Sequence, residues 1–217
     1  MKNRSFAIAA LLAVVPATHA ADQGAFISIS AGQSRSQIDR DFAPNRIGRA
    51  FATLAGYRWA VNSRLSLGVE GGYAALGEAN YHLVEPYSYT FYEGGTVSGV
   101  DRERIAYKAK AYLLGINSQW NVNDRWNLSA HYGWARYRTT LLVLGSSTFY
   151  DKKTQYDATS NDIRNGRYFG LGVGFKVAEY LNLSVTADRY KPTYRQIYGD
   201  TFSYGINVWG LRAEYLF

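Results

Sequence analysis

The last nine residues of the chain read Trp209-Gly210-Leu211-Arg212-Ala213-Glu214-Tyr215-Leu216-Phe217. Every odd position carries an apolar or aromatic side chain, whereas Gly210, Arg212 and Glu214 fall on even positions. A β-strand places residues two apart on the same face, so this pattern predicts a strand with one apolar and one polar face. Such a strand is typical of a transmembrane β-barrel, which turns apolar side chains to lipid and polar ones to its interior.

The first 20 residues predict a secretory signal peptide. Lys2 and Arg4 precede an apolar run over residues 6–15, and small residues lead up to a cleavage site after Ala20. The run is shorter than the roughly 20 residues that a helix needs to span a bilayer. We expect residues 1–20 to be removed and residues 21–217 to form one outer-membrane domain. Losing two cations lowers the formal net charge from +7 to +5, an excess too small to indicate a nucleic-acid partner.

A short unit recurs three times, starting at Trp59, Trp120 and Phe175. Each copy consists of aromatic-x-Val, a short polar turn and large-x-Leu, which predicts a tight turn between two strands. Three such turns join six strands, and one strand at each end makes eight. We therefore predict an all-β fold, an eight-stranded antiparallel up-and-down transmembrane β-barrel. Its expected strands cover residues 25–33, 50–59, 65–75, 108–120, 126–137, 167–177, 181–190 and 202–217.

Four segments carry a family likeness: residues 68–73 (Gly-Val-Glu-Gly-Gly-Tyr), 120–133, 172–175 (Gly-Val-Gly-Phe) and the closing strand. In this order they resemble the transmembrane domain of the OmpA-like barrels, and more loosely the OmpX and Ail type. The resemblance implies that Glu70 belongs to an interior ion-pair network, with Arg58 and Arg212 as candidate partners. Ser184 stands where the family has a gating arginine. The likeness covers the barrel alone, so the peptidoglycan binding of OmpA is not expected.

In each predicted strand, the alternate positions that carry polar side chains would point into the barrel. An eight-stranded barrel is only wide enough for its own side chains, and charges removed from water must be paired. We therefore expect an interior plugged by ion pairs. The predicted network consists of Arg58, Glu70, His131, Lys176, Asp188, Arg212 and Glu214.

The alternate positions that carry apolar side chains are predicted to form the surface that contacts lipid. Tryptophan and tyrosine favour the boundary between acyl chains and water, so aromatic residues near the short turns predict a girdle at the periplasmic interface. That girdle is expected to contain Trp59, Trp120, Trp126 and Tyr215. The family resemblance also implies an assembly signal in the closing strand, formed by Trp209, Leu211, Tyr215 and Phe217.

The connections opposite the short turns are predicted to be long, polar external loops over residues 34–49, 76–107, 138–166 and 191–201. They are basic and rich in tyrosine, and the alternation of Tyr87, Tyr89 and Phe91 indicates that strands extend beyond the membrane as a β-ribbon. Basic side chains there can contact lipopolysaccharide phosphates or anionic cell-surface molecules. The candidate contact residues are Arg35, Arg40, Arg46, Arg49, Lys152 and Lys153.

These features predict an outer-membrane protein with a structural or surface-interaction role. Its expected partners are membrane lipid, lipopolysaccharide, the barrel-assembly machinery and host or cell-surface ligands, and it is expected to be a monomer without a cofactor. A small passive porin-like channel is the first alternative. A lipid A-modifying enzyme is the second, but the candidate base His131 and the nearby Ser129 would both point inward rather than to lipid.

Overall fold

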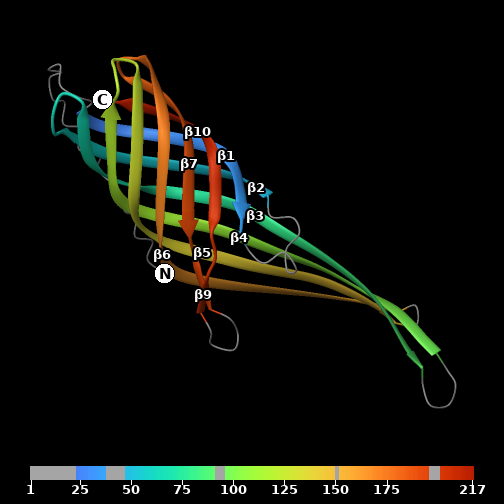
Figure 1. Ribbon diagram of the computed structural model, residues 1–217. Helices are drawn as coiled ribbons and strands as arrows, with labels where there is room; N and C mark the ends of the chain where they lie inside the picture. The colour runs from blue at the N-terminus through green and yellow to red at the C-terminus, as the bar shows by residue number, and fades with distance from the viewer. Residues whose placement is uncertain (1–22, 38–46, 91–95, 150–151, 196–200) are drawn as a thin grey trace, which may run out of the picture.

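The computed structural model describes residues 23–37, 47–90, 96–149, 152–195 and 201–217, which are almost entirely β-strand (Figure 1). The predicted signal peptide over residues 1–20 lies outside the described residues. The strands are β1 (Gly24–Ser36), β2 (Ile47–Ala60), β3 (Leu65–Thr90), β4 (Thr96–Asn121), β5 (Trp126–Phe149), β6 (Lys152–Ala178), β7 (Leu181–Lys191), β8 (Thr193–Arg195), β9 (Thr201–Ser203) and β10 (Ile206–Leu216).

Eight strands close into an antiparallel barrel in the order β1-β10-β7-β6-β5-β4-β3-β2, and β8 and β9 form a separate two-stranded sheet. First and last strands meet at the closure, where Ile27 lies opposite Tyr215. The backbone N–H of Phe217 also donates to the carbonyl of Ala25 at 2.8 Å. Closure leaves no free strand edge in the barrel wall, which lipid requires because it cannot satisfy unpaired backbone groups. The predicted eight-stranded antiparallel barrel is confirmed.

Two of the three short turns are built in the same way by an asparagine. Oδ1 of Asn62 accepts hydrogen bonds from the backbone N–H groups of Arg64 and Leu65, at 2.8 and 2.9 Å. Oδ1 of Asn123 accepts the equivalent bonds from Arg125 and Trp126, at 3.0 and 2.8 Å. Asparagine favours such turns because its side chain can bond to the backbone two or three residues on. The repeated unit in the sequence therefore corresponds to a repeated turn.

Four strands are much longer than predicted. β3 to β6 continue past the barrel as a four-stranded sheet over residues 78–90, 96–108, 140–149 and 152–161, which we call the blade (Figure 1). Its part of β3 alone extends roughly 40 Å at about 3.3 Å per residue. The predicted loops over 76–107 and 138–166 are therefore wrong for most of their length, whereas the strand extension that the alternation at Tyr87 and Tyr89 indicated is confirmed for β3. Their polar composition is that of a loop, whereas pairing with neighbouring strands keeps them extended.

A β-bulge in β3 marks the point where the barrel ends and the blade begins. The pairing of β3 with β4 shifts register between Ala75 and Glu78. Within this bulge Gly77 has a φ of 87°, in the left-handed region that favours glycine. A Cβ at this position would also come within 2.6 Å of the hydroxyl oxygen of Ser34 on β1. Bulges bend a strand and increase its twist, which fits the departure of the blade from the barrel.

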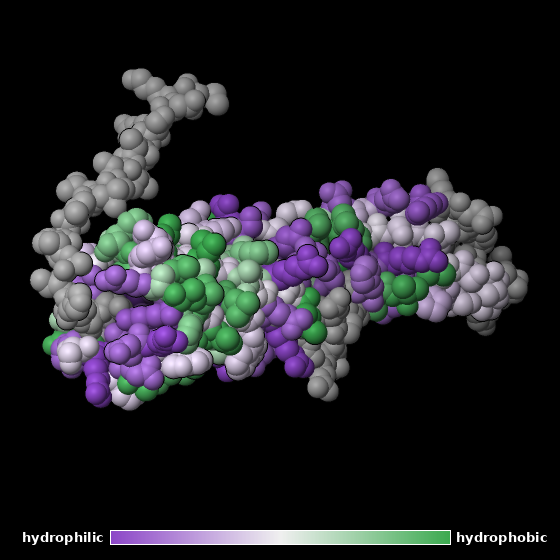
Figure 2. All heavy atoms as spheres, turned by 90° about the horizontal axis from the view of Figure 1, so that it is seen from above, coloured by the Kyte–Doolittle hydropathy of each residue, from purple (hydrophilic) through white to green (hydrophobic). Residues whose placement is uncertain are grey.

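Side chains alternate strictly between the two surfaces of the barrel wall. Ile29, Leu114, Leu171 and Leu211 are more than 60 % exposed, although all are apolar. On the face shown in Figure 2, apolar side chains gather over the barrel, and most of the blade surface is polar. An apolar exterior of this extent matches lipid rather than water. Among the described residues no helix is long and apolar enough to cross a membrane.

Candidate functional site

The first cluster in the barrel interior centres on Arg58 of β2. Its Nη1 and Nη2 lie 2.5 and 2.8 Å from Oε1 and Oε2 of Glu214 on β10. Its Nε donates to Oδ1 of Asn117 at 2.7 Å, and Nη1 also donates to Oε1 of Gln119 at 2.8 Å. The guanidinium lies 4.2 Å from the ring centroid of Phe26. Because the Arg58 side chain is only 4 % exposed, these partners replace the water that the cation has lost.

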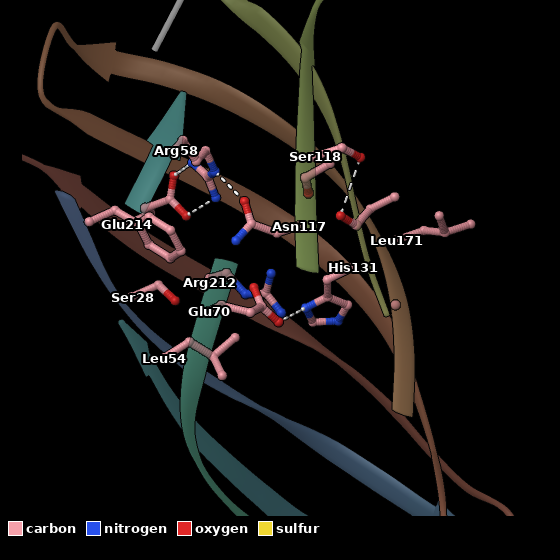
Figure 3. Close-up of a pocket in the computed structure, with 14 residues that line it drawn as sticks. Ser28, Leu54, Arg58, Glu70, Asn117, Ser118, His131, Leu171, Arg212 and Glu214 are labelled. Atoms are coloured by element: carbon pink, nitrogen blue, oxygen red, sulfur yellow. Dashed lines mark hydrogen bonds and ion pairs between the residues drawn. The ribbon is translucent and has the colours of Figure 1, made fainter. Parts of the chain in front are cut away.

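The second cluster is a chain of ionisable side chains that crosses the barrel, and Figure 3 shows its contact between Glu70 and His131. Nδ1 of His131 on β5 lies 3.0 Å from Oε1 of Glu70 on β3, and Nε2 lies 3.1 Å from Oδ1 of Asp188 on β7. Oδ2 of Asp188 lies 3.3 Å from Nη2 of Arg212 on β10. Tyr168 of β6 donates its hydroxyl to Oε1 of Glu70 at 2.9 Å. Five of the eight strands are thereby cross-linked through one buried network.

Both ring nitrogens of His131 face carboxylate oxygens. A carboxylate accepts hydrogen bonds but cannot donate them, so the contact of Nε2 with Asp188 fits a ring nitrogen that carries a proton. Nδ1 lies at ion-pair distance from Glu70 but makes no hydrogen bond with a described residue. The two carboxylates thus flank the imidazole, and Arg212 lies on the far side of Asp188. Neither nitrogen is placed to take a proton from Ser129, as a catalytic base would have to do.

The direct partners of Glu70 differ from those that the family resemblance implied. Arg58 pairs with Glu214 and Arg212 pairs with Asp188, whereas Glu70 contacts His131 and Tyr168. The strand parity that we used puts all of these side chains inside, but it does not determine how far each lies along the barrel. Ser184, which stands where the family has a gating arginine, lies directly opposite Arg212 on the neighbouring strand.

Lys176 lies at the turn end of β6, beside a second β-bulge, and its side chain is partly exposed. Its backbone N–H donates to the carbonyl of Arg125 at 2.8 Å. Its membership of the interior network stays a prediction.

Three residues of the interior site were missed by the sequence analysis: Gln119, Tyr168 and Gly170. A Cβ at Gly170 would overlap both Asp188 and His131, so this glycine makes room for their contact. Tyr168 packs edge-on against His131, with ring centroids 5.3 Å apart. Both residues share the inward parity of Gly172, which was the available signal.

Side chains fill the interior of the described barrel. A cavity of about 10 Å³ lies between the two clusters, against Arg58, Glu70 and His131, and is about the size of a single water molecule. Towards the blade, the interior is occupied by Tyr137, which is fully buried, and by Tyr190, which is 2 % exposed. This packing disfavours a continuous aqueous path.

The predicted girdle residues lie near the short turns and are about half-exposed: Trp59, Trp120, Trp126 and Tyr215. The ring of Trp126 contacts Phe175, and the ring of Tyr215 contacts Phe217, at centroid distances of 5.1 and 4.9 Å. The outward residues of the closing strand, Trp209, Leu211 and Phe217, are more than 60 % exposed. Their roles in lipid anchoring and in assembly stay predictions.

The candidate loop residues are distributed differently from the sequence prediction. Arg35 is an exposed residue of β1, and Arg49 is an exposed residue of β2, so both belong to strands. Lys152 and Lys153 belong to β6. Arg40 and Arg46 lie outside the described residues. The predicted placement of these four residues in loops is therefore wrong, because strand pairing holds their backbones, and their contacts with a ligand stay a prediction.

The two faces of the blade differ in chemistry. The face continuous with the barrel exterior carries the exposed side chains of Arg102 and Arg104. On the opposite face, the hydroxyl of Tyr156 donates to Glu103. This hydrogen bond to a carboxylate raises the pKa of Tyr156, because the bond requires the phenolic proton. Tyr156 spans from β6 across β5 to β4, so it braces three strands of the blade.

A closed eight-stranded barrel with an apolar exterior and a charge-paired interior defines the class of integral outer-membrane β-barrels. Comparisons with known proteins find no matching family model and no match among curated proteins. Solved structures do match. Ail, the attachment invasion locus protein of Yersinia pestis, is 15 % identical over 90 % of this chain and 99 % of its own, with a TM-score of 0.47.

Two further barrels are similar at a lower level. Neisserial surface protein A is 12 % identical over 89 % of this chain and 97 % of its own, with a TM-score of 0.43. The N-terminal β-barrel domain of Pseudomonas aeruginosa OprF is 12 % identical over 89 % of this chain and 99 % of its own, with a TM-score of 0.38. The placement of this chain in the membrane follows from its own apolar exterior.

Proposed function

We propose that this protein is a surface-interaction protein, in which the barrel anchors the blade in the outer membrane and the blade binds anionic molecules outside the cell. The observation that carries the proposal is the blade itself. It continues the barrel strands beyond the apolar exterior and exposes arginines on one face. A barrel that served only as a membrane structure would not need this projecting sheet.

The blade offers two modes of contact. Arg102 and Arg104 have exposed side chains, although Arg104 also lies 3.7 Å from Glu78. Guanidinium groups bind sulfate, phosphate or carboxylate in a bidentate way. Beyond Ala75, β3 pairs only with β4 among the described residues, and the part of β6 that precedes Arg167 pairs only with β5. Both outer edges of the blade therefore keep backbone groups that can pair with an extended segment of another protein.

The interior clusters argue against the two alternatives. A porin-like channel needs an aqueous path, whereas the interior is filled by paired charges and tyrosines. A lipid A-modifying enzyme needs a base and a nucleophile that face lipid, whereas His131 is 7 % exposed inside the barrel and is held between two carboxylates. We therefore assign the interior a structural role.

Immobilised heparin, a sulfated polysaccharide, tests this function with the purified full chain in zwitterionic detergent. The variant Arg102→Gln with Arg104→Gln is expected to bind about tenfold more weakly, which corresponds to about 0.7 kcal/mol lost per arginine. The matched control is Arg64→Gln with Arg125→Gln, which removes two exposed arginines at the short turns instead. Equal affinity of the blade variant and the parent protein would refute the proposal, as would an equal loss in the control.

A further inference from the structure

A row of six basic residues lies on the outer surface where the blade leaves the barrel. It runs across four adjacent strands, from β4 to β7. Five members are exposed and Arg189 is partly exposed. We call this set the cationic belt: Lys110, Arg136, Arg138, Arg167, Arg189 and Lys191.

Strand pairing makes the belt continuous. Lys110 lies directly opposite Arg138, and Arg167 lies directly opposite Lys191. Arg136 is the diagonal neighbour both of Lys110 and of Arg167, because it pairs with Tyr112 on one side and Asn165 on the other. Direct neighbours of this kind have Cα atoms about 5 Å apart, and diagonal neighbours about 7–8 Å apart. Groups at these spacings can share one anionic ligand.

No acidic side chain balances the belt among the described residues. None of its six members forms an ion pair with a described residue, and Arg189 donates a hydrogen bond to the neutral Gln37 at 2.9 Å. Like charges directly opposite each other destabilise a sheet, and the belt contains two such pairs. Further along β4 into the blade, Lys108 and Arg104 do have an acidic partner. Nζ of Lys108 and Nη2 of Arg104 lie 3.1 and 3.7 Å from the carboxylate oxygens of Glu78. The belt therefore differs from Lys108 and Arg104 in having no acidic partner among the described residues.

The belt lies against the upper rim of the apolar exterior. Lys110 is two residues beyond the exposed Tyr112, Arg136 is two residues beyond Trp134, and Arg167 is two residues beyond Phe169. Residues two apart on a strand share a face, so each cation stands directly above a ring that meets acyl chains. This is the level at which lipid headgroups begin.

We propose that the cationic belt binds the phosphorylated headgroup of a lipid in the outer leaflet. Arginine binds phosphate through two parallel hydrogen bonds, and lysine adds a point charge. The aromatic row beneath the belt contacts the acyl chains of the same molecule, so one amphipathic ligand satisfies both surfaces. A free phosphate ion would use only the upper one. The belt is separate from the blade, so this site goes beyond the proposed surface-interaction role.

The test measures binding of lipid A with two phosphates to the purified full chain in zwitterionic detergent, by native mass spectrometry across a lipid titration. Dephosphorylated lipid A with the same acyl chains is the ligand control. The variant Arg136→Gln with Arg167→Gln is expected to bind phosphorylated lipid A at least about tenfold more weakly and dephosphorylated lipid A as before. The variant Arg136→Lys with Arg167→Lys keeps the charge and is expected to keep the preference for phosphate.

The blade variant Arg102→Gln with Arg104→Gln is the matched protein control, because it removes the same charge elsewhere. It is expected to bind lipid A normally, even if it has lost heparin, so the two proposals can fail separately. Equal binding of phosphorylated and dephosphorylated lipid A would overturn the inference, and so would an equal loss in the blade variant. Complete displacement of lipid A by inorganic phosphate at constant ionic strength would assign the belt to free phosphate and would also overturn it.

Discussion

Arg58 carries a charge into a part of the barrel that has almost no access to water, and Glu214 is its compensating anion. Removing one partner of such a buried pair leaves the other charge uncompensated, which typically costs about 3–5 kcal/mol. Replacing both by apolar side chains removes the desolvation penalty together with the attraction. The pair therefore predicts strongly non-additive effects of substitution.

We expect Arg58→Met and Glu214→Leu each to lower the free energy of unfolding by about 3–5 kcal/mol, and the double variant to lower it by less than either single variant. The measurement is denaturant unfolding in phospholipid vesicles, followed by tryptophan fluorescence. Additive losses in the double variant would show that the two side chains are not coupled.

Gly170 determines whether His131 and Asp188 can approach each other. Gly170→Ala would force a methyl group onto both side chains, so we expect a loss of about 1–3 kcal/mol in the same unfolding assay. Gly71→Ala is the matched control, because a Cβ there would have its nearest neighbour 3.5 Å away, at ordinary contact distance. That control is expected to change stability by less than about 0.5 kcal/mol. Equal effects of the two substitutions would contradict the packing described for the His131 cluster.

At the scale of the strand, the face on which each barrel residue lies was predictable, and the alternation at Tyr87 and Tyr89 indicated that strands continue past the barrel. The lengths of β5 and β6 were not predictable. The alternation from Trp209 to Phe217 fixes which side chains face lipid, because the period of a strand is two. In the blade, side chains still alternate between the two faces, but hydropathy does not distinguish these faces. Neighbours such as Asp101 and Arg102, which lie on opposite faces, are both charged. Partner choice inside the barrel was also beyond the sequence, since Arg58 meets a residue 156 positions away whose height depends on the stagger of all the strands.

The lipid face of the strands can be tested with single arginines. Leu67 and Val173 are 47 % and 49 % exposed on the barrel exterior. We expect Leu67→Arg and Val173→Arg each to cost about 2–4 kcal/mol in vesicles, provided that the site lies near the bilayer midplane. Val84→Arg places the same side chain on the exposed outer face of the blade, directly opposite Arg102, and we expect a cost of less than about 1 kcal/mol there, which comes from the like charge. Similar costs at all three positions would mean that the blade is also embedded in lipid.

At the scale of the whole molecule, the barrel and the blade differ in their strand edges and in the polarity of their surfaces. The barrel wall has no free edge, whereas the blade keeps two edges and polar faces that lipid would not tolerate. The β3 bulge at Gly77 lies at the transition between them. The cationic belt lies at the same level on the other strands. The boundary between apolar and polar surface thus coincides with a change in backbone geometry.

The filled interior predicts the electrical behaviour of the complete barrel. Ion flow requires a continuous aqueous path, and both the Arg58 cluster and the His131 cluster stand across it, with Tyr168 packed against His131. We expect the wild-type protein to produce no stepwise current in a planar bilayer at neutral pH. A variant with His131→Ala and Tyr168→Ala shortens two side chains that cross the interior, and it is expected to admit a small leak. Stepwise currents from the wild-type protein would show that these clusters rearrange readily, and that the porin-like alternative describes the barrel better than a packed structural anchor.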